Sequence, residues 1–259
     1  MLLAGKVVLV TGVGVGIGRQ VATAAFEAGA RVVLAARTRE RVEEAARQLD
    51  PSGQRVLGAT VDLRDADSCT ALVTRCVERF ETIDAMVQNA AFENAAGGLF
   101  KLDLAQWAQA YDTNMLGALR LLRAVVPVMR EHGGGSIVLI GSQSMYKVSL
   151  PQSGYAASKG ALHAAAIYLA DELGPDNIRV NTVAPGWTWG PAIEGFVQRR
   201  AQRQGRTTQE VIHDIAGRFP MRRMADEREV ADAAVFFCSR LARGITGQSL
   251  LVNCGDVMR

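Results

Sequence analysis

The sequence lacks the features typical of secreted, membrane-spanning and nucleic-acid-binding proteins. Residues 1–6 contain no charged segment followed by a long apolar run, so a signal peptide is not expected. No apolar run approaches the ~18 residues of a membrane span. The 29 lysines and arginines against 26 aspartates and glutamates give a net charge of +3 without a basic arm, which argues against nucleic acid as a partner. We therefore expect a cytoplasmic protein that binds neither membranes nor nucleic acid.

Cysteine is scarce, and its spacing indicates neither disulfides nor a metal site. The four cysteines form no CxxC pair and no cluster with the spacing of metal ligands. Cys69 and Cys76 lie seven residues apart on one predicted helix, where both are expected to be apolar fillers. Reduced thiols and no bound metal are the prediction.

The 259 residues contain short apolar runs that alternate with helical segments, and 49% of the residues are hydrophobic, enough for a large core. Runs such as Val7–Val10 are typical of strands buried on both faces. Strands are predicted over 7–10, 31–36, 54–61, 83–87, 136–142, 178–183 and 249–252. Helices are predicted over 19–28, 39–49, 66–80, 104–129, 153–173 and 229–241. This alternation predicts one α/β domain over 1–259, with a doubly wound parallel sheet of about seven strands and ligands at the strands' carboxyl ends.

A glycine-rich turn follows the first predicted strand and precedes the first helix. Its sequence is TGVGVGIG at residues 11–18. Glycines permit a tight turn and a close approach of the backbone, and a helix N-terminus offers unpaired N–H groups to phosphate. A dinucleotide is therefore expected here, a tight structural turn being the alternative. The expected contacts are Gly12, Gly14, Gly16, Ile17 and Gly18.

The end of the second strand indicates which dinucleotide is bound. An acidic residue about 20 positions beyond the glycines would bind a ribose 2′-hydroxyl. Ala36 and Arg37 occupy this region instead. The small Ala36 leaves room for a 2′-phosphate, with which Arg37, helped by Thr38 or Arg39, can pair. NADP(H) is expected over NAD(H), although NAD(H) stays possible because these arginines can also be the solvated start of a helix.

Two further strand ends are expected beside the cofactor. Asp62, followed by Leu63, ends the third strand, where its carboxylate can accept a hydrogen bond from the adenine amino group. The fourth strand ends in QNAA at residues 88–91, where Asn89 and Ala90 are expected to let a ribose pass close to the backbone.

Two residues capable of acid–base chemistry lie near the start of the helix predicted over 153–173. Tyr155 and Lys159 are four residues apart, so a helix places them on one face, roughly 6 Å apart. A neighbouring ammonium favours the phenolate, and lowering the phenol pKa from ~10 by about three units needs only about 4 kcal/mol. The pair is therefore expected to exchange protons near pH 7. Alone, this spacing is also common on solvated helices.

The positions of Ser142 and Asn114 in the predicted elements indicate a role for each. Ser142 ends the fifth predicted strand, shortly before the helix that carries Tyr155. Asn114 lies inside a predicted helix, where asparagine is unfavourable, so a tertiary role is expected.

Together these motifs resemble the short-chain dehydrogenase/reductase family over essentially the whole chain. The resemblance rests on the glycine motif, Asn89-Ala90, Asn114, Ser142, Tyr155 with Lys159, and Pro185-Gly186. It implies a Rossmann fold, a homotetramer or homodimer, and cofactor contacts from Pro185, Gly186 and, at the nicotinamide carboxamide, Thr188. The chain departs from the family at Val15, where many NADP-dependent members have a basic residue, and at residues 88–91, where the family has NNAG.

The resemblance also implies a role for each catalytic residue. Tyr155 is the acid and base, and Ser142 hydrogen-bonds the substrate oxygen. Lys159 holds the nicotinamide ribose and favours the tyrosinate. Asn114 helps to hold a water molecule in a proton relay.

A segment over about 187–220 exceeds what the sheet requires and is expected to be a substrate lid. Its aromatic residues indicate an apolar or ring-bearing substrate. Its arginines at 199, 200, 203 and 206 are expected either to bind an anionic handle or to face solvent. The expected substrate contacts are Gln143, Gln152, Trp187, Trp189 and Phe196, with Leu150 beside them.

Three functions are compatible with these residues. The first is an NADP(H)-dependent carbonyl reductase or secondary-alcohol dehydrogenase. The second is a 3-oxoacyl-thioester reductase, whose carrier protein would dock on arginines such as Arg120, Arg123 and Arg130. The third is a nucleotide-binding sensor without turnover, which would have no need for the phenol and the hydroxyl together.

Overall fold

The computed structural model describes residues 1–95 and 97–259. Seven strands form the main sheet: β1 (Val7–Thr11), β2 (Arg31–Ala36), β3 (Val56–Thr60), β4 (Ala85–Gln88), β5 (Gly135–Ile140), β6 (Ile178–Pro185) and β9 (Ser249–Val252). They lie in the order β3-β2-β1-β4-β5-β6-β9 and every neighbouring pair is parallel. The order reverses after β1, which places the switch point between β1 and β4. The prediction of a doubly wound parallel sheet is confirmed.

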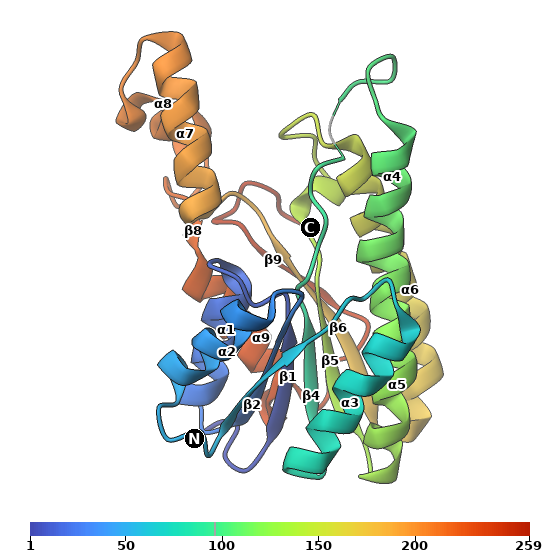
Figure 1. Ribbon diagram of the computed structural model, residues 1–259. Helices are drawn as coiled ribbons and strands as arrows, with labels where there is room; N and C mark the ends of the chain where they lie inside the picture. The colour runs from blue at the N-terminus through green and yellow to red at the C-terminus, as the bar shows by residue number, and fades with distance from the viewer. Residues whose placement is uncertain (96) are drawn as a thin grey trace.

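Helices cover both faces of this sheet (Figure 1). On one face lie α1 (Ile17–Glu27), α2 (Arg39–Leu49) and α9 (Glu227–Cys238), and on the other lie α3 (Ala66–Phe80), α5 (Gly117–Glu131) and α6 (Ser153–Leu173). Strand β1 shows why both layers form. Val7 and Leu9 pack into one core, and Val8 and Val10 into the other, because successive side chains of a strand point to opposite faces. Each fully buried side chain of this kind contributes about 1.5–3 kcal/mol.

The helix predicted over 104–129 is divided. Helix α4 (Leu104–Tyr111) leads into a π-helical turn, Asp112–Leu116, and then into α5. A π turn inserts an extra residue into the helix, and such turns often mark functional sites. Here it contains the fully buried Asn114. The periodicity of apolar residues gave no sign of this interruption.

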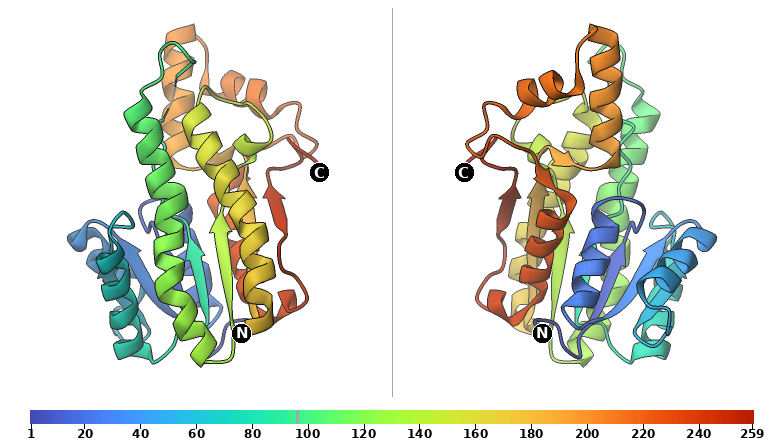
Figure 2. Two further views of the ribbon diagram at one scale, coloured as in Figure 1. Left: turned by 90° about the vertical axis from the view of Figure 1, so that its right-hand side faces the viewer. Right: turned by 90° about the vertical axis from the view of Figure 1, so that its left-hand side faces the viewer.

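The segment expected as a lid contains more structure than predicted. It holds β7 (Thr188–Trp189), α7 (Pro191–Gln204) and α8 (Thr208–Ala216), and β7 pairs in parallel with β8 (Ala225–Asp226). Helices α7 and α8 rise beyond the carboxyl ends of the strands (Figures 1 and 2). Helix α4 and the loop that precedes it stand beyond the same edge, on the other side (Figure 1). The cavity of interest is lined by residues from both groups of elements.

Within the described residues, no helix has the length and apolar character needed to cross a membrane. The same residues contain no group of histidine, cysteine and acidic side chains arranged to hold a metal ion. Cys69 and Cys76 are buried in the core and carry free thiols, and burial raises their pKa values to about 11 and about 12. The prediction that they are apolar fillers is confirmed.

Candidate active site

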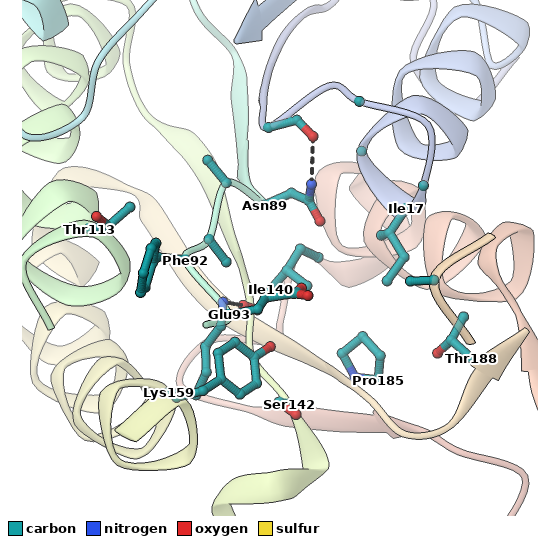
Figure 3. A pocket seen from close by; sticks show the side chains of 18 of the residues that line it. Ile17, Asn89, Phe92, Glu93, Thr113, Ile140, Ser142, Lys159, Pro185 and Thr188 are labelled. Carbon is teal, nitrogen blue, oxygen red and sulfur yellow. Dashed lines mark hydrogen bonds between the residues drawn. The ribbon is translucent and has the colours of Figure 1, made fainter. Parts of the chain in front are cut away.

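A cavity of about 550 Å³ lies at the carboxyl ends of the strands. It extends from the ends of β2 and β3, past the glycine turn, to β5, α6 and the first turn of α7. Figure 3 shows side chains from these separate elements lining one space. Almost all of the predicted cofactor and catalytic residues line it; Asn114 and Arg39, the latter expected only as a possible helper of Arg37, do not.

The glycine turn and the end of β4 fit against each other without room for a side chain. Gly12 has a φ of +68°, and a Cβ placed there would lie 2.5 Å from Cα of Ala90. A Cβ at Gly18 would lie 2.6 Å from Nδ2 of Asn89, which donates a 3.0 Å hydrogen bond to the Gly12 carbonyl oxygen. The two predicted cofactor segments therefore stabilise each other. Gly16 caps α1 without a side-chain hydrogen bond, which leaves the helix N-terminus to a phosphate.

Gln88 explains how this chain tolerates its departure from the family's NNAG. The Gln88 side chain is buried, accepts a hydrogen bond from the Thr11 hydroxyl and donates through Nε2 to the Ala90 carbonyl oxygen at 3.1 Å. Thr11 Oγ1 in turn accepts hydrogen bonds from the backbone N–H groups of Asn89 and Ala90. The longer side chain thus holds the turn that follows it.

Arginines concentrate at the end of the cavity beside β2. Ala36, Arg37 and Thr38 line it, as does Arg41, which the sequence analysis did not single out. Arg41 lies in the first turn of α2, and Arg37 lies in the turn between β2 and that helix. Arg39 instead pairs with Glu43 at 2.8 Å and is not among the lining residues.

The end of β3 contributes a carboxylate that is already paired. Asp62 Oδ2 lies 2.6 Å from the guanidinium of Arg64, and Oδ1 accepts a hydrogen bond from the Arg64 backbone N–H. The hydrogen bond from Arg64 lowers the pKa of Asp62 to about 2. Asp62, Leu63 and Arg64 all line the cavity. A hydrogen bond from Asp62 to adenine stays a prediction.

Ser142, Tyr155 and Lys159 meet at the opposite end. Ser142 follows β5 and caps a 3₁₀ turn, Gln143–Met145, accepting a 2.9 Å hydrogen bond from the Ser144 hydroxyl. Tyr155 lies in the first turn of α6, and its phenol lies near enough to the Ser142 side chain for that side chain to lower its pKa. The ammonium of Lys159, one turn on, donates to the Ile140 carbonyl oxygen at 2.6 Å and lies 5.7 Å from the centre of the Tyr155 ring.

The protein's own groups shift the two pKa values differently from the sequence expectation. Burial raises the pKa of Tyr155, the negative charge of Glu93 raises it further, and the Ser142 side chain opposes both. Burial lowers the pKa of Lys159 to about 8, against the effect of Glu93. The argument from Lys159 alone was therefore incomplete, because it left out desolvation of both groups and a carboxylate beside them.

The turn after β6 forms the wall facing the glycine turn. Pro185, Gly186, Trp187 and Thr188 all line the cavity, and the Thr188 hydroxyl donates to the Gly186 carbonyl oxygen at 3.2 Å. A Cβ at Gly186 would lie 2.6 Å from Cβ of Asn253, so only glycine fits this turn.

The predicted substrate residues divide into two groups. Gln152, Trp187 and Leu150 line the cavity, whereas Trp189 and Phe196 do not; Phe196 packs on Trp187 with ring centres 5.6 Å apart. Gln143 reaches the cavity, but its amide is bonded elsewhere. Its Nε2 donates to Asp256 at 2.7 Å and its Oε1 accepts from Asn253 at 3.1 Å. These two bonds attach the C-terminal segment to the turn after Ser142.

Asn114 lies behind the cavity. Its Oδ1 accepts a 2.6 Å hydrogen bond from the Phe92 backbone N–H, and its Nδ2 donates to the Phe92 carbonyl oxygen at 3.0 Å and the Ser158 hydroxyl at 2.9 Å. The expected tertiary role is thus to join the loop after β4 to α6. Its part in a water relay stays a prediction.

The arginine-rich run on α7 is not among the residues that line the cavity, where α7 contributes Ala192 and Ile193. Arg206, beyond the end of α7, pairs with Asp214 at 2.5 Å. Two of the arginines considered for carrier-protein docking are paired as well, Arg120 with Asp112 and Arg130 with Asp176.

Two acidic residues of the cavity were missed. Glu93 follows β4 by five residues, and Glu227 opens α9. Glu227 lies beside the phosphate turn, since a Cβ at Gly16 would be 3.2 Å from its Oε1. Burial raises the pKa of Glu227. The position of Glu93 after a strand end was a usable signal; Glu227 had none, because the fold brings it there from 200 residues away.

Comparison with known proteins places the chain among oxidoreductases. The sequence model of the family described as "Enoyl-(Acyl carrier protein) reductase" matches residues 12–256. The human dehydrogenase/reductase SDR family member 4 is 32% identical over 257 residues, which cover 99% of this chain and 89% of the relative.

Two solved structures are similar over nearly their full length. L-sorbose reductase from Gluconobacter frateurii, complexed with NADPH and L-sorbose, has a TM-score of 0.92 and 30% identity, with all of both chains covered. NAD⁺-bound xylitol dehydrogenase has a TM-score of 0.90 and 28% identity, with 98% of this chain and 100% of the other covered.

Proposed function

The chain belongs to the short-chain dehydrogenase/reductase family, and we propose that this NAD(P)-dependent enzyme transfers a hydride between NADP(H) and a ketone or secondary alcohol that carries a ring. The observation that carries the proposal is the meeting of Ser142, Tyr155 and Lys159 in the cavity that also holds the glycine turn. A protein that only binds a nucleotide would not need this set.

The residues present fit a dinucleotide. Gly12, Gly18 and Gly186 each stand where a side chain would collide with neighbouring backbone or side chains, so the turns that line the cavity pack closely together. The N-terminus of α1 offers N–H groups for the pyrophosphate. Lys159 and the turn at Pro185 are the contacts for the nicotinamide half, with Thr188 for its carboxamide. When bound, the dinucleotide supplies or accepts the hydride.

Arg37 and Arg41 support NADP(H) over NAD(H). Both line the cavity beside the uncharged Ala36, and both side chains are exposed toward it, so a 2′-phosphate can be held by two guanidinium groups. Of the two solved neighbours, the L-sorbose reductase holds NADPH and the xylitol dehydrogenase holds NAD⁺. The preference for NADP(H) therefore rests on these two arginines.

The chain's own groups account for the proton transfer. In reduction, Tyr155 donates its phenolic proton to the substrate oxygen while Ser142 donates a hydrogen bond to the same atom. Because the pKa of Tyr155 is raised, the phenol carries its proton at neutral pH. In the reverse direction Tyr155 accepts the proton from the alcohol. The nearby ammonium of Lys159 then favours the phenolate.

Apolar side chains support a substrate with a ring. Trp187, Leu150, Ile193 and Phe92 line the substrate end of the cavity. We propose that residues 187–220 act as a lid over this end, since α7 contributes to its lining.

Assembly and location are part of the same proposal. Ile167 and Tyr168 on α6 and Leu250 on β9 are exposed apolar side chains, which supports association of copies into a homotetramer or homodimer. The four free thiols support a cytoplasmic location.

Nicotinamide absorbance, followed over a panel of cyclic and linear ketones and alcohols, tests the proposal. Oxidation of NADPH with a cyclic ketone is the expected result, and no turnover with any member would favour a nucleotide-binding sensor. Coenzyme A thioesters of 3-oxoacids belong in the panel, and their preference over free ketones would favour the acyl-thioester alternative. Thermal stabilisation tests the cofactor: equal protection by NADH and NADPH would show the argument from Arg37 to be wrong.

A further inference from the structure

Glu93 places a negative charge at the reacting end of the cavity. It lines the cavity on the loop that follows β4, and Figure 3 shows it next to Lys159 and Ile140. Its charge raises the pKa values of both Tyr155 and Lys159, so it acts on both catalytic groups. The mechanism above gives Glu93 no task.

The loop that carries Glu93 is held on both sides. Phe92, just before it, is bound through its backbone N–H and carbonyl oxygen by the buried carboxamide of Asn114. Ala95, just after it, accepts a 3.2 Å hydrogen bond from the backbone N–H of Gly154, next to Tyr155 in the first turn of α6. Gly154 also leaves no space between the two segments, since a Cβ there would lie 2.8 Å from Cβ of Ala95. The backbone on both sides of Glu93 is therefore held against the helix that carries the acid and base, while the Glu93 side chain is exposed.

The Glu93 carboxylate has unused acceptor capacity. The side chain is exposed, and it makes no hydrogen bond or ion pair with a side chain of residues 1–95 or 97–259. Lys159, its cationic neighbour, donates instead to the Ile140 carbonyl oxygen at 2.6 Å. The Glu93 carboxylate repels an anionic group on the substrate, and the adjacent Lys159 ammonium repels a cationic one. A neutral hydrogen-bond donor is repelled by neither and can bind the carboxylate.

We propose that Glu93 is a specificity-determining residue that accepts a hydrogen bond from a hydroxyl group of the substrate, close to the reacting carbon. The proposal rests on the proposed function and refines it, because the preferred substrate becomes a hydroxylated ring ketone or a cyclic diol. A site built to bind a substrate hydroxyl discriminates strongly against an analogue without it.

The test compares ring ketones that differ in a hydroxyl group. Cyclohexanone, 2-hydroxycyclohexanone and 4-hydroxycyclohexanone are reduced with NADPH by the wild type and by the Glu93→Ala and Glu93→Gln variants. We expect kcat/KM of the wild type to favour at least one hydroxyketone about 10- to 100-fold, as for a hydrogen bond to a charged group. In Glu93→Ala this ratio falls to near one, mainly through the hydroxyketone, and Glu93→Gln gives an intermediate ratio. Glu78→Gln, at an exposed glutamate on α3 outside the cavity lining, keeps the wild-type ratio.

Binding measurements separate this inference from the proposed function. Dissociation constants of cyclohexanol and of cis- and trans-1,2-cyclohexanediol for the protein with NADP⁺ are measured by calorimetry, which requires no turnover. Tighter binding of a diol, lost in Glu93→Ala, supports the inference even if no ketone is reduced. Equal binding of diol and alcohol by the wild type, or a preference that survives in Glu93→Ala, overturns it. Weaker NADPH binding by Glu93→Ala with an unchanged substrate ratio also overturns it, because the carboxylate would then serve the cofactor.

Discussion

Replacing Tyr155 with phenylalanine removes a single oxygen atom from the centre of the site. The aromatic ring and its packing beside Lys159 remain, and at most one polar interaction, that of the phenol with Ser142, is lost. Because the pKa of Tyr155 is raised, the wild-type phenol is neutral at pH 7 and no charge is removed from the folded protein. One neutral hydrogen bond contributes about 0.5–1.5 kcal/mol, so Tm should change by less than roughly 6 °C.

The effect on catalysis should be much larger. General acid catalysis by a positioned side chain contributes about 10²–10⁴ in rate, and we expect Tyr155→Phe to lose at least about 100-fold, or about 2.7 kcal/mol of barrier. The pH dependence of the oxidation rate gives a second test of the role of Tyr155. Alcohol oxidation needs the phenolate, so the wild-type oxidation rate rises as pH rises toward the raised pKa of Tyr155, and the variant loses this rise.

The assay pairs turnover with cofactor binding. NADPH at 100 times its Kd stabilises a folded protein by about 2.7 kcal/mol, and this stabilisation should be the same in Tyr155→Phe as in the wild type. Tyr111→Phe is the matched control, since Tyr111 at the end of α4 is 44% exposed and does not line the cavity. Near-wild-type turnover by Tyr155→Phe, with Tm and NADPH binding intact, would remove Tyr155 from the mechanism.

Three further substitutions test the cofactor site and its supports. Arg37→Asp should lower the ratio of NADPH to NADH affinity by about 10- to 100-fold, the range of a charge-assisted hydrogen bond, and an unchanged ratio would contradict the assignment. Glu227→Gln should tighten NADPH binding about 2- to 5-fold, as for a half-exposed charge near phosphate. Burial raises the pKa of Glu227, so its carboxylate repels the cofactor phosphate only as pH rises through that pKa. The NADPH affinities of the wild type and Glu227→Gln should therefore differ at pH 8 and converge at acidic pH. A difference in affinity that does not depend on pH would refute this. Gln143→Ala breaks the hydrogen bonds to Asn253 and Asp256. We expect the free energy of unfolding to fall by roughly 2–4 kcal/mol and Tm to fall by roughly 5–10 °C, and an unchanged Tm would contradict this.

Much of the fold was predictable because its strands are continuous apolar runs with both faces buried. The bounds of β2, α2, α3 and α6 agree with the predicted ranges, and β1 and β5 differ at their ends by one or two residues. The π turn at Asp112–Leu116 was not predictable, because it depends on Asn114 reaching Phe92 and Ser158 rather than on any local pattern. The two-residue strands β7 and β8 are too short to leave a periodic signal.

The site was predictable where the fold itself fixes positions. Strand ends and helix starts of a parallel sheet meet at one edge, so the positions of Gly12, Ser142 and Tyr155 followed from their places along the chain. The positions along the chain did not show which polar side chains remain free to bind a ligand and which are bonded within the protein. Gln143 has a suitable position but gives its amide to Asn253 and Asp256, more than 100 residues away.

Asn114 shows how the catalytic residues and the substrate wall of this site depend on each other. Its carboxamide joins the loop after β4, through Phe92, to α6, through Ser158, and Glu93 stands between that attachment and the next one at Ala95. A change in Asn114 would therefore move Glu93 relative to Tyr155, and not only disturb a proton relay. A loss of rate in an Asn114 variant therefore has two possible causes. The ratio of kcat/KM for hydroxylated and plain ring ketones separates them. A damaged relay slows both substrates alike, whereas a displaced Glu93 slows the hydroxylated one more.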